Sequence, residues 1–161
     1  MTLTYFDRIT KETPTKLWVN NPSRAETDWA IANHAINCTT NPSFCAKLLE
    51  SDPDHIRSAI DEAIKESDDD NVAADLAYQK VAAWVMERFR PLYERSGGAY
   101  GYVTIQADPR EDEDADLIVK ASLRHSKLGK NYMAKIPVVP AGIEAIEALV
   151  ARDIPICATE I

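Results

Sequence analysis

A lysine inside an apolar run is the residue of this 161-residue sequence whose position most directly suggests chemistry. Lys135 stands in Tyr132–Val139, YMAKIPVV, where an ammonium group would have to leave water. Burial favours the neutral amine, which can attack a carbonyl carbon and form an imine. A lysine at the end of a strand can also pack its stem on apolar neighbours and extend its ammonium into water. The residues that accompany Lys135 must decide between these two roles.

Polar residues follow four other short apolar segments in a similar way. In barrels that alternate strands and helices, reactive residues lie at the C-terminal ends of the strands and in the loops beyond. Amides and hydroxyls at such ends can hold the hydroxyl groups of a ligand, but an amide cannot exchange a proton near neutral pH. The candidates on this rule are Asn20, Thr40, Asn41, Gln106, Asp108 and the segment from Cys157 to Thr159.

Strands and helices alternate in the sequence, and this alternation would position the candidates. Apolar segments of a few residues predict strands, and apolar residues at helical spacing predict helices. Ser23 with Glu26 three residues later is a capping box that begins the second helix, and Pro91 is expected to break the longest one. The predicted strands are 16–19, 38–40, 100–107, 132–138 and 154–159, and the predicted helices are 5–13, 24–37, 44–50, 54–67, 71–94, 114–127 and 141–152.

This order predicts an α/β fold with parallel strands, in a single domain over residues 1–161. Neither a GxGxxG nor a GxxxxGK[ST] phosphate loop follows any predicted strand, so a nucleotide-binding fold lacks its usual signature. A (β/α)8 barrel typically needs about 250 residues, and five strands make only part of one. An open parallel sheet exposes a flank. We therefore expect a C-terminal half of the barrel, or a second copy in a homo-oligomer, to cover it.

Composition excludes several classes of function. The formal charge of −8 argues against binding to nucleic acid or to an anionic membrane surface. The N-terminal segment does not resemble a signal peptide, and no apolar run is long enough for a transmembrane helix. The three cysteines lack CxxC spacing and the three histidines are isolated, so we expect a cytoplasmic protein with reduced thiols and no metal or other cofactor.

Five segments, taken in order, resemble the successive strand motifs of transaldolases. Their order and spacing agree with that family over about residues 15–161. The resemblance implies a (β/α)8 TIM barrel of the transaldolase type, of which this chain holds about the first five strands. The segments are Leu17–Asn20, Thr39–Ser43, Val103–Arg110, Asn131–Pro137 and Gly142–Ile146.

The resemblance also implies an activity: transfer of a dihydroxyacetone unit between sugar phosphates through a lysine Schiff base, in the pentose phosphate pathway. Lys135 falls on the Schiff-base position. Asn20 and Gln106 fall where family members usually carry a catalytic aspartate and glutamate. The substrate-binding positions implied are Asn41, Thr40, Cys157 and Thr159; Asn41 and Thr159 match the family, whereas Cys157 replaces an asparagine.

The two amides leave alternatives to transaldolase turnover. One is a divergent enzyme with another substrate, and the other is a non-catalytic relative that binds a sugar phosphate or a protein partner. Asp108 and Glu160 are nearby carboxylates, but the sequence assigns catalysis to neither, since Asp108 fits a turn and Arg110 a structural ion pair. The phosphate-binding arginine and serine of the family lie beyond the fifth strand.

Overall fold

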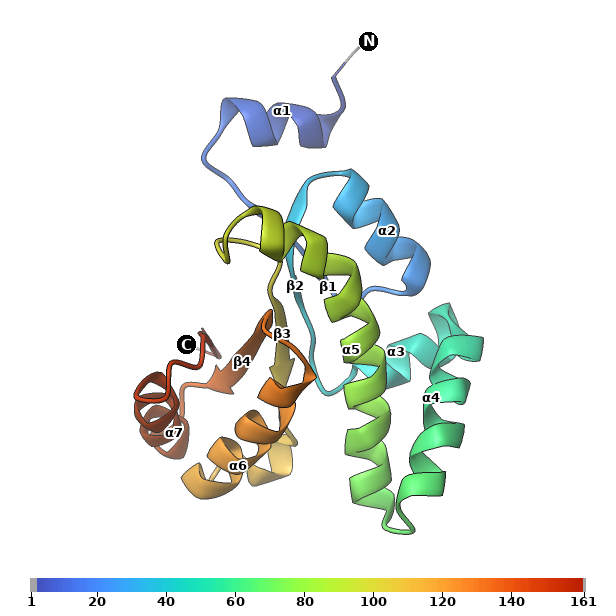
Figure 1. The fold of residues 1–161 in the computed structure, drawn as a ribbon, viewed down its shortest axis with the longest axis vertical. Helices are drawn as coiled ribbons and strands as arrows, with labels where there is room; N and C mark the ends of the chain where they lie inside the picture. The colour runs from blue at the N-terminus through green and yellow to red at the C-terminus, as the bar shows by residue number, and fades with distance from the viewer. Residues whose placement is uncertain (1–2, 161) are drawn as a thin grey trace.

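Five parallel strands form one curled sheet in the computed structural model, which describes residues 3–160. The strands pair in sequence order, so each connection returns over the same side of the sheet and carries one or more helices. The result is half of a (β/α) barrel (Figure 1), as the sequence predicted. The strands are β1 (Leu17–Asn20), β2 (Ala35–Thr39), β3 (Val103–Gln106), β4 (Tyr132–Pro137) and β5 (Ile156–Thr159).

Helices cover the outer face of this sheet. The longest, α5, lies against β2 and β3 with α4 alongside it, while α6 and α7 lie against β4 (Figure 1). Helix α1 extends beyond the other helices where the chain begins, and the rings of Phe6 and Trp29 join it to α2. The helices are α1 (Tyr5–Glu12), α2 (Arg24–Ala32), α3 (Phe44–Ser51), α4 (Pro53–Glu66), α5 (Asp70–Arg95), α6 (Ala115–His125) and α7 (Pro140–Val150), with 3-10 turns η1 (Pro109–Glu111) and η2 (Ser126–Leu128).

The two faces of the sheet differ in polarity because successive side chains of a strand point to opposite sides. The outer face packs against the helices and is apolar: Val103, Ile105, Ala134 and Ile136 are buried there. The inner face is more polar, although Trp18 and Met133 also lie on it, and the pairing of neighbouring strands aligns its polar residues. They include Asn20, Thr39, Thr104, Gln106, Lys135, Cys157 and Thr159.

Close packing at two places fixes the ends of the strand that carries Lys135. A Cβ atom at Gly142 would lie 2.0 Å from the carbonyl oxygen of Pro137, so α7 rests directly on the C-terminal end of β4. Before the strand begins, Asn131 is buried and donates hydrogen bonds of 2.9 Å to the carbonyls of Met86 and Gly101. Such buried bonds make sliding of the strand costly.

The predicted helix over 24–37 is wrong in its second half. Helix α2 ends at Ala32, and β2 already begins at Ala35, three residues before the predicted strand. His34 adopts a φ of 70°, a left-handed conformation that ends the helix. Ala35 and Ile36 happen to continue the apolar spacing of α2, and this coincidence misled the sequence pattern.

The predicted break at Pro91 is also wrong, because α5 continues through this residue to Arg95. Proline removes one backbone donor and fixes φ, but the φ that its ring imposes is compatible with an α-helix. Residues on both sides of Pro91 keep α5 in place. Phe89 is buried in the hydrophobic core, and Leu92 packs against the same core. Burial of one such side chain contributes about 1.5–3 kcal/mol.

Within residues 3–160, no helix combines the length and the apolar character needed to cross a bilayer.

Candidate functional site

Lys135 stands near the C-terminal end of β4, on the inner face. In the sheet it is level with Gln106 of β3 and Cys157 of β5. The strand around it is buried, whereas Lys135 itself is half-buried. The side chain therefore leaves a packed strand and enters the polar side of the half-barrel, where a ligand could reach its amine.

A chain of hydrogen bonds joins Lys135 to the ends of β1 and β2. Its Nζ donates to Oδ1 of Asn41, and Nδ2 of Asn41 donates to Oδ1 of Asn20 at 2.9 Å. A lysine ammonium can only donate, so its bond fixes which end of the Asn41 amide faces it. The structure thus brings together three of the residues singled out in the sequence, from three different strand ends.

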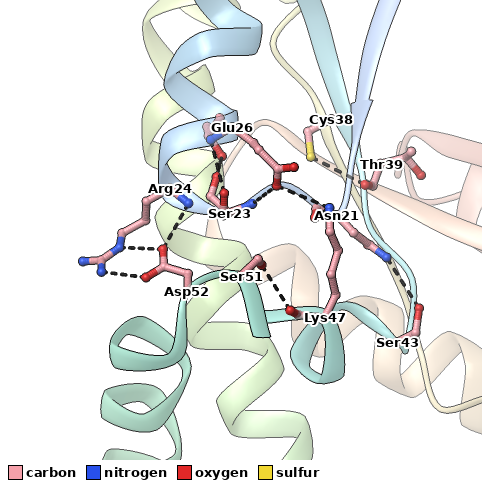
Figure 2. A network of polar contacts seen from close by, with 11 residues as sticks. Asn21, Ser23, Arg24, Glu26, Cys38, Thr39, Ser43, Lys47, Ser51 and Asp52 are labelled. Carbon is pink, nitrogen blue, oxygen red and sulfur yellow. Dashed lines mark hydrogen bonds and ion pairs between the residues drawn. The ribbon is translucent and has the colours of Figure 1, made fainter. Parts of the chain in front are cut away.

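The loops after β1 and β2 are tied to each other by Asn21, which the sequence analysis did not select (Figure 2). Its Oδ1 accepts the backbone N–H of Asn41 at 2.9 Å, and its own N–H donates to the carbonyl of Thr39 at 3.0 Å. Lys47 of α3 donates to the Asn21 carbonyl at 2.9 Å and to Glu26 at 3.3 Å. These bonds hold Asn20 and Asn41 side by side.

The start of α2 completes this network (Figure 2). Ser23 and Glu26 form the predicted capping box, with the Ser23 N–H donating to the Glu26 carboxylate at 2.8 Å. Arg24 meets Asp52 between α3 and α4 with hydrogen bonds of 2.7 and 2.8 Å, and its guanidinium lowers the pKa of Asp52 to about 2. The β1–α2 connection, which follows Asn20, is therefore held at Asn21 by its bond with Asn41 and at Arg24 by its bonds with Asp52.

Thr40 lies on the opposite side of the sheet from Lys135. It follows Thr39, which faces inward, so Thr40 faces the helices and is fully buried. Its Oγ1 donates to the Thr104 carbonyl at 2.7 Å and lies 2.5 Å from the phenol oxygen of Tyr78 in α5. Contact between Thr40 and a substrate stays a prediction, and the structure does not bring this hydroxyl to the other candidates.

Gln106 of β3 lies beside Lys135 on the side toward β2, and Cys157 and Thr159 of β5 occupy the other flank of Lys135. Gln106 is only 4% exposed, and its Nε2 donates to Glu160 just after β5 at 3.3 Å. Cys157 is half-buried, and Thr159 is half-buried at the end of β5, paired with Pro137. Amides, a hydroxyl and a thiol thus line the site around one amine, an arrangement suited to a polyhydroxylated carbonyl compound.

Asp108 and Arg110 have the structural roles expected of a turn. The Asp108 carboxylate accepts the Arg110 backbone N–H at 2.9 Å and caps η1. The Arg110 guanidinium binds the same carboxylate and also donates to Asn71 at 2.9 Å, and it lowers the pKa of Asp108. The predicted structural roles of Asp108 and Arg110 are both confirmed.

Within residues 3–160, no group of three or more histidine, cysteine or acidic side chains is placed to hold a metal ion.

The three free thiols differ in reactivity. Burial raises the pKa of Cys45 to about 11 and that of Cys38 still further, whereas the positive charge of Lys135 partly offsets the burial that raises the pKa of Cys157. The thiolate is the reactive form, so at pH 8 iodoacetamide is expected to label Cys157 first and Cys38 last. A time course of peptide masses measures the order, and labelling of Cys38 or Cys45 before Cys157 would contradict it.

A lysine at a strand end, surrounded by amides inside a curled parallel sheet, defines a protein of the (β/α)-barrel class with a candidate imine-forming site. The family model described as transaldolase/fructose-6-phosphate aldolase matches residues 17–161. The chain belongs to this family.

Curated relatives agree with this assignment. A transaldolase of Mycobacterium ulcerans is 30% identical over 126 residues, which cover 77% of this chain and 34% of the relative. Transaldolase 1 of Streptomyces avermitilis is 28% identical over 128 residues, covering 78% and 34%. A transaldolase of Neisseria meningitidis is 26% identical over 152 residues, covering 88% and 42%. The chain therefore spans between a third and somewhat over two fifths of these relatives.

Proposed function

We propose that this chain carries the Schiff-base half of a transaldolase-like site, in which Lys135 binds the carbonyl carbon of a ketose phosphate and a dihydroxyacetone unit passes to another sugar phosphate. The observation that carries the proposal is the placement of the Lys135 amine on the polar inner face, hydrogen-bonded to Asn41. Membership in the transaldolase family supports it. An amine held there is aimed at the space that a ligand of the barrel would occupy.

The neighbours of Lys135 have roles that follow from their chemistry. Asn41 holds the amine before reaction, and once nitrogen becomes part of an imine the same amide is free to bind a substrate hydroxyl. Asn20 and Thr159, on either side, offer further hydrogen bonds to the carbon chain. The protonated imine then withdraws electrons from the neighbouring carbon–carbon bond, which breaks.

Borohydride trapping with fructose 6-phosphate tests the proposal in the full-length protein. Reduction of the imine leaves a stable adduct, which intact mass reveals and peptide mass assigns to a residue. We expect the adduct on Lys135 and none in Lys135→Met. Lys130→Met is the matched control, because Lys130 is exposed before the start of β4 and is expected to leave trapping unchanged. An adduct that persists in Lys135→Met would refute the assignment.

A second candidate function is a divergent or non-catalytic relative that binds a sugar phosphate or a protein partner. The observation that favours it is that two residues of the site, Asn20 and Gln106, carry amides that make hydrogen bonds but cannot exchange protons. Binding without imine formation would appear as protection of Cys157 from alkylation by a ketose phosphate, with no borohydride adduct. Cleavage of another ketose, with an adduct on Lys135, would instead indicate a divergent aldolase.

The exposed flanks of the half-barrel also need a cover. Strands β1 and β5 are the edges of the sheet, and unpaired edges favour association. We propose that further strands of the same protein, or a second copy of the chain, pair with them and enclose Lys135. The molar mass of the full-length protein in solution distinguishes the two arrangements.

A further inference from the structure

One hydrogen bond of the site spans a whole strand. Gln106 belongs to β3 and Glu160 follows β5, so the 3.3 Å bond between them passes over the C-terminal end of β4. Lys135 is the β4 residue level with Gln106, on the same inner face. The bond therefore places a carboxylate on the flank of the lysine site, opposite the flank occupied by Asn20 and Asn41.

The backbone at Glu160 directs this side chain. Its φ is 60°, in the left-handed region that a residue with a Cβ atom adopts infrequently. Glu160 itself is exposed, and the buried amide of Gln106 holds one of its carboxylate oxygens.

Apart from the Lys135 amine and the Cys157 thiol, the side chains placed at this site among residues 3–160 offer one group that exchanges protons near neutral pH. Asn20, Asn41 and Gln106 are amides, and among residues 3–160 the carboxylate of Glu160 is the acidic group hydrogen-bonded to one of them. Imine formation and carbon–carbon cleavage both require a proton donor or acceptor beside the reacting atoms. Glu160 meets this need by its chemistry and its place.

Several charged groups surround this carboxylate. Burial raises the pKa of Asp112. The negative charge of Glu160 raises it further, and that of Asp108 adds a smaller effect in the same direction. The guanidinium of Arg110 is bound to Asp108 and so offsets that charge. On the other strands, Lys135 provides a positive charge and Cys157 a thiol. The carboxylate of Glu160 therefore shares its surroundings with acidic neighbours, and its partner Gln106 is level with Lys135 in the sheet.

We propose that Glu160 is the acid–base group of the Lys135 site, in a role that rests on the function proposed above. The Lys135 amine adds to the ketose carbonyl, a C–N bond forms, and a proton moves from nitrogen to oxygen. The carboxylic acid of Glu160 protonates this hydroxyl, the C–O bond breaks, water leaves and a positively charged C=N bond remains. The carboxylate then takes the proton of the substrate hydroxyl beside the breaking C–C bond, whose electron pair moves to the imine.

The variant Glu160→Gln separates this role from a structural one. Its amide oxygen can still accept the bond from Gln106, but the side chain can no longer exchange protons. We expect cleavage of fructose 6-phosphate by the full-length protein to slow by about 10²-fold or more, with loss of the acidic limb of the pH–rate profile. The borohydride adduct on Lys135 is still expected after long incubation, and Glu160→Asp is expected to recover part of the rate with the acidic limb present.

The control is Glu144→Gln, the same chemical change on the exposed surface of α7, which is expected to leave both rate and profile unchanged. A Glu160→Gln protein with the rate and pH profile of the wild type would overturn the role of Glu160 while the adduct on Lys135 upholds the proposed function. A slower variant whose acidic limb persists would make Glu160 structural and would also overturn the proposal. Absence of an adduct in the wild type overturns both proposals together.

Discussion

Replacing Asn20 with aspartate is expected to raise the rate of ketose phosphate cleavage by about 10²- to 10⁴-fold. Asn20 accepts the 2.9 Å bond from Asn41, and an aspartate carboxylate would accept the same bond without a change of shape. The substitution alters mainly the ability to exchange a proton. A general base at the end of β1 would serve the flank of the substrate that Glu160 does not reach.

Turnover of fructose 6-phosphate by Asn20→Asp, measured by the appearance of product, checks this expectation. The matched control is Asn71→Asp, the same change at an exposed residue that contacts Arg110 rather than the lysine site. Both variants are expected to trap the same adduct on Lys135. An unchanged cleavage rate in Asn20→Asp, with trapping intact, would show that the end of β1 does not face the reacting hydroxyl.

Gln106→Glu, the corresponding change from an amide to a carboxylate, is not expected to act as Asn20→Asp does. A glutamate there would stand about 3.3 Å from the carboxylate of Glu160, and two like charges so close favour keeping one proton. The two amide positions of the site are therefore not equivalent. The amide at Gln106 is a donor that its acidic neighbour requires, whereas the amide at Asn20 is an acceptor that a carboxylate can replace.

The strand order and the meeting of Lys135 with Asn20 and Asn41 followed from the sequence. Apolar segments of strand length with short connections predict parallel strands, and parallel strands bring their C-terminal ends to one edge. This geometry brings the loops at the strand ends together, whereas which side chain of each strand faces inward depends on the exact register. The family resemblance then added a role for Lys135 that apolar patterning alone left open.

Features that depend on a single backbone angle or on one side chain's direction were not predictable. His34 ends α2 through a left-handed conformation that its residue type does not demand. Asn21 joins two loops through its amide, although only its turn-forming type was visible in the sequence. Thr39 and Thr40 are identical in type, and which of them faces the ligand depends on the register of β2, where one residue reverses the face.

Thr40→Val is expected to lower the free energy of unfolding by about 1–3 kcal/mol while leaving the adduct on Lys135 intact. Valine has nearly the same shape as threonine but no hydroxyl. The buried phenol of Tyr78 would lose its 2.5 Å partner, and the Thr104 carbonyl would lose a 2.7 Å bond. An unsatisfied polar group in the interior is costly because no water replaces the missing partner.

Denaturant unfolding measures this loss, with Thr15→Val as control because Thr15 is exposed. Tyr78→Phe removes the other end of the same bond, so the double variant is expected to be more stable than the sum of the single losses implies. If Thr40 contacted the substrate, Thr40→Val would instead raise the KM for the ketose phosphate and change the stability little. The two roles therefore differ in which measurement responds, and the burial of Thr40 behind the sheet favours a response in stability.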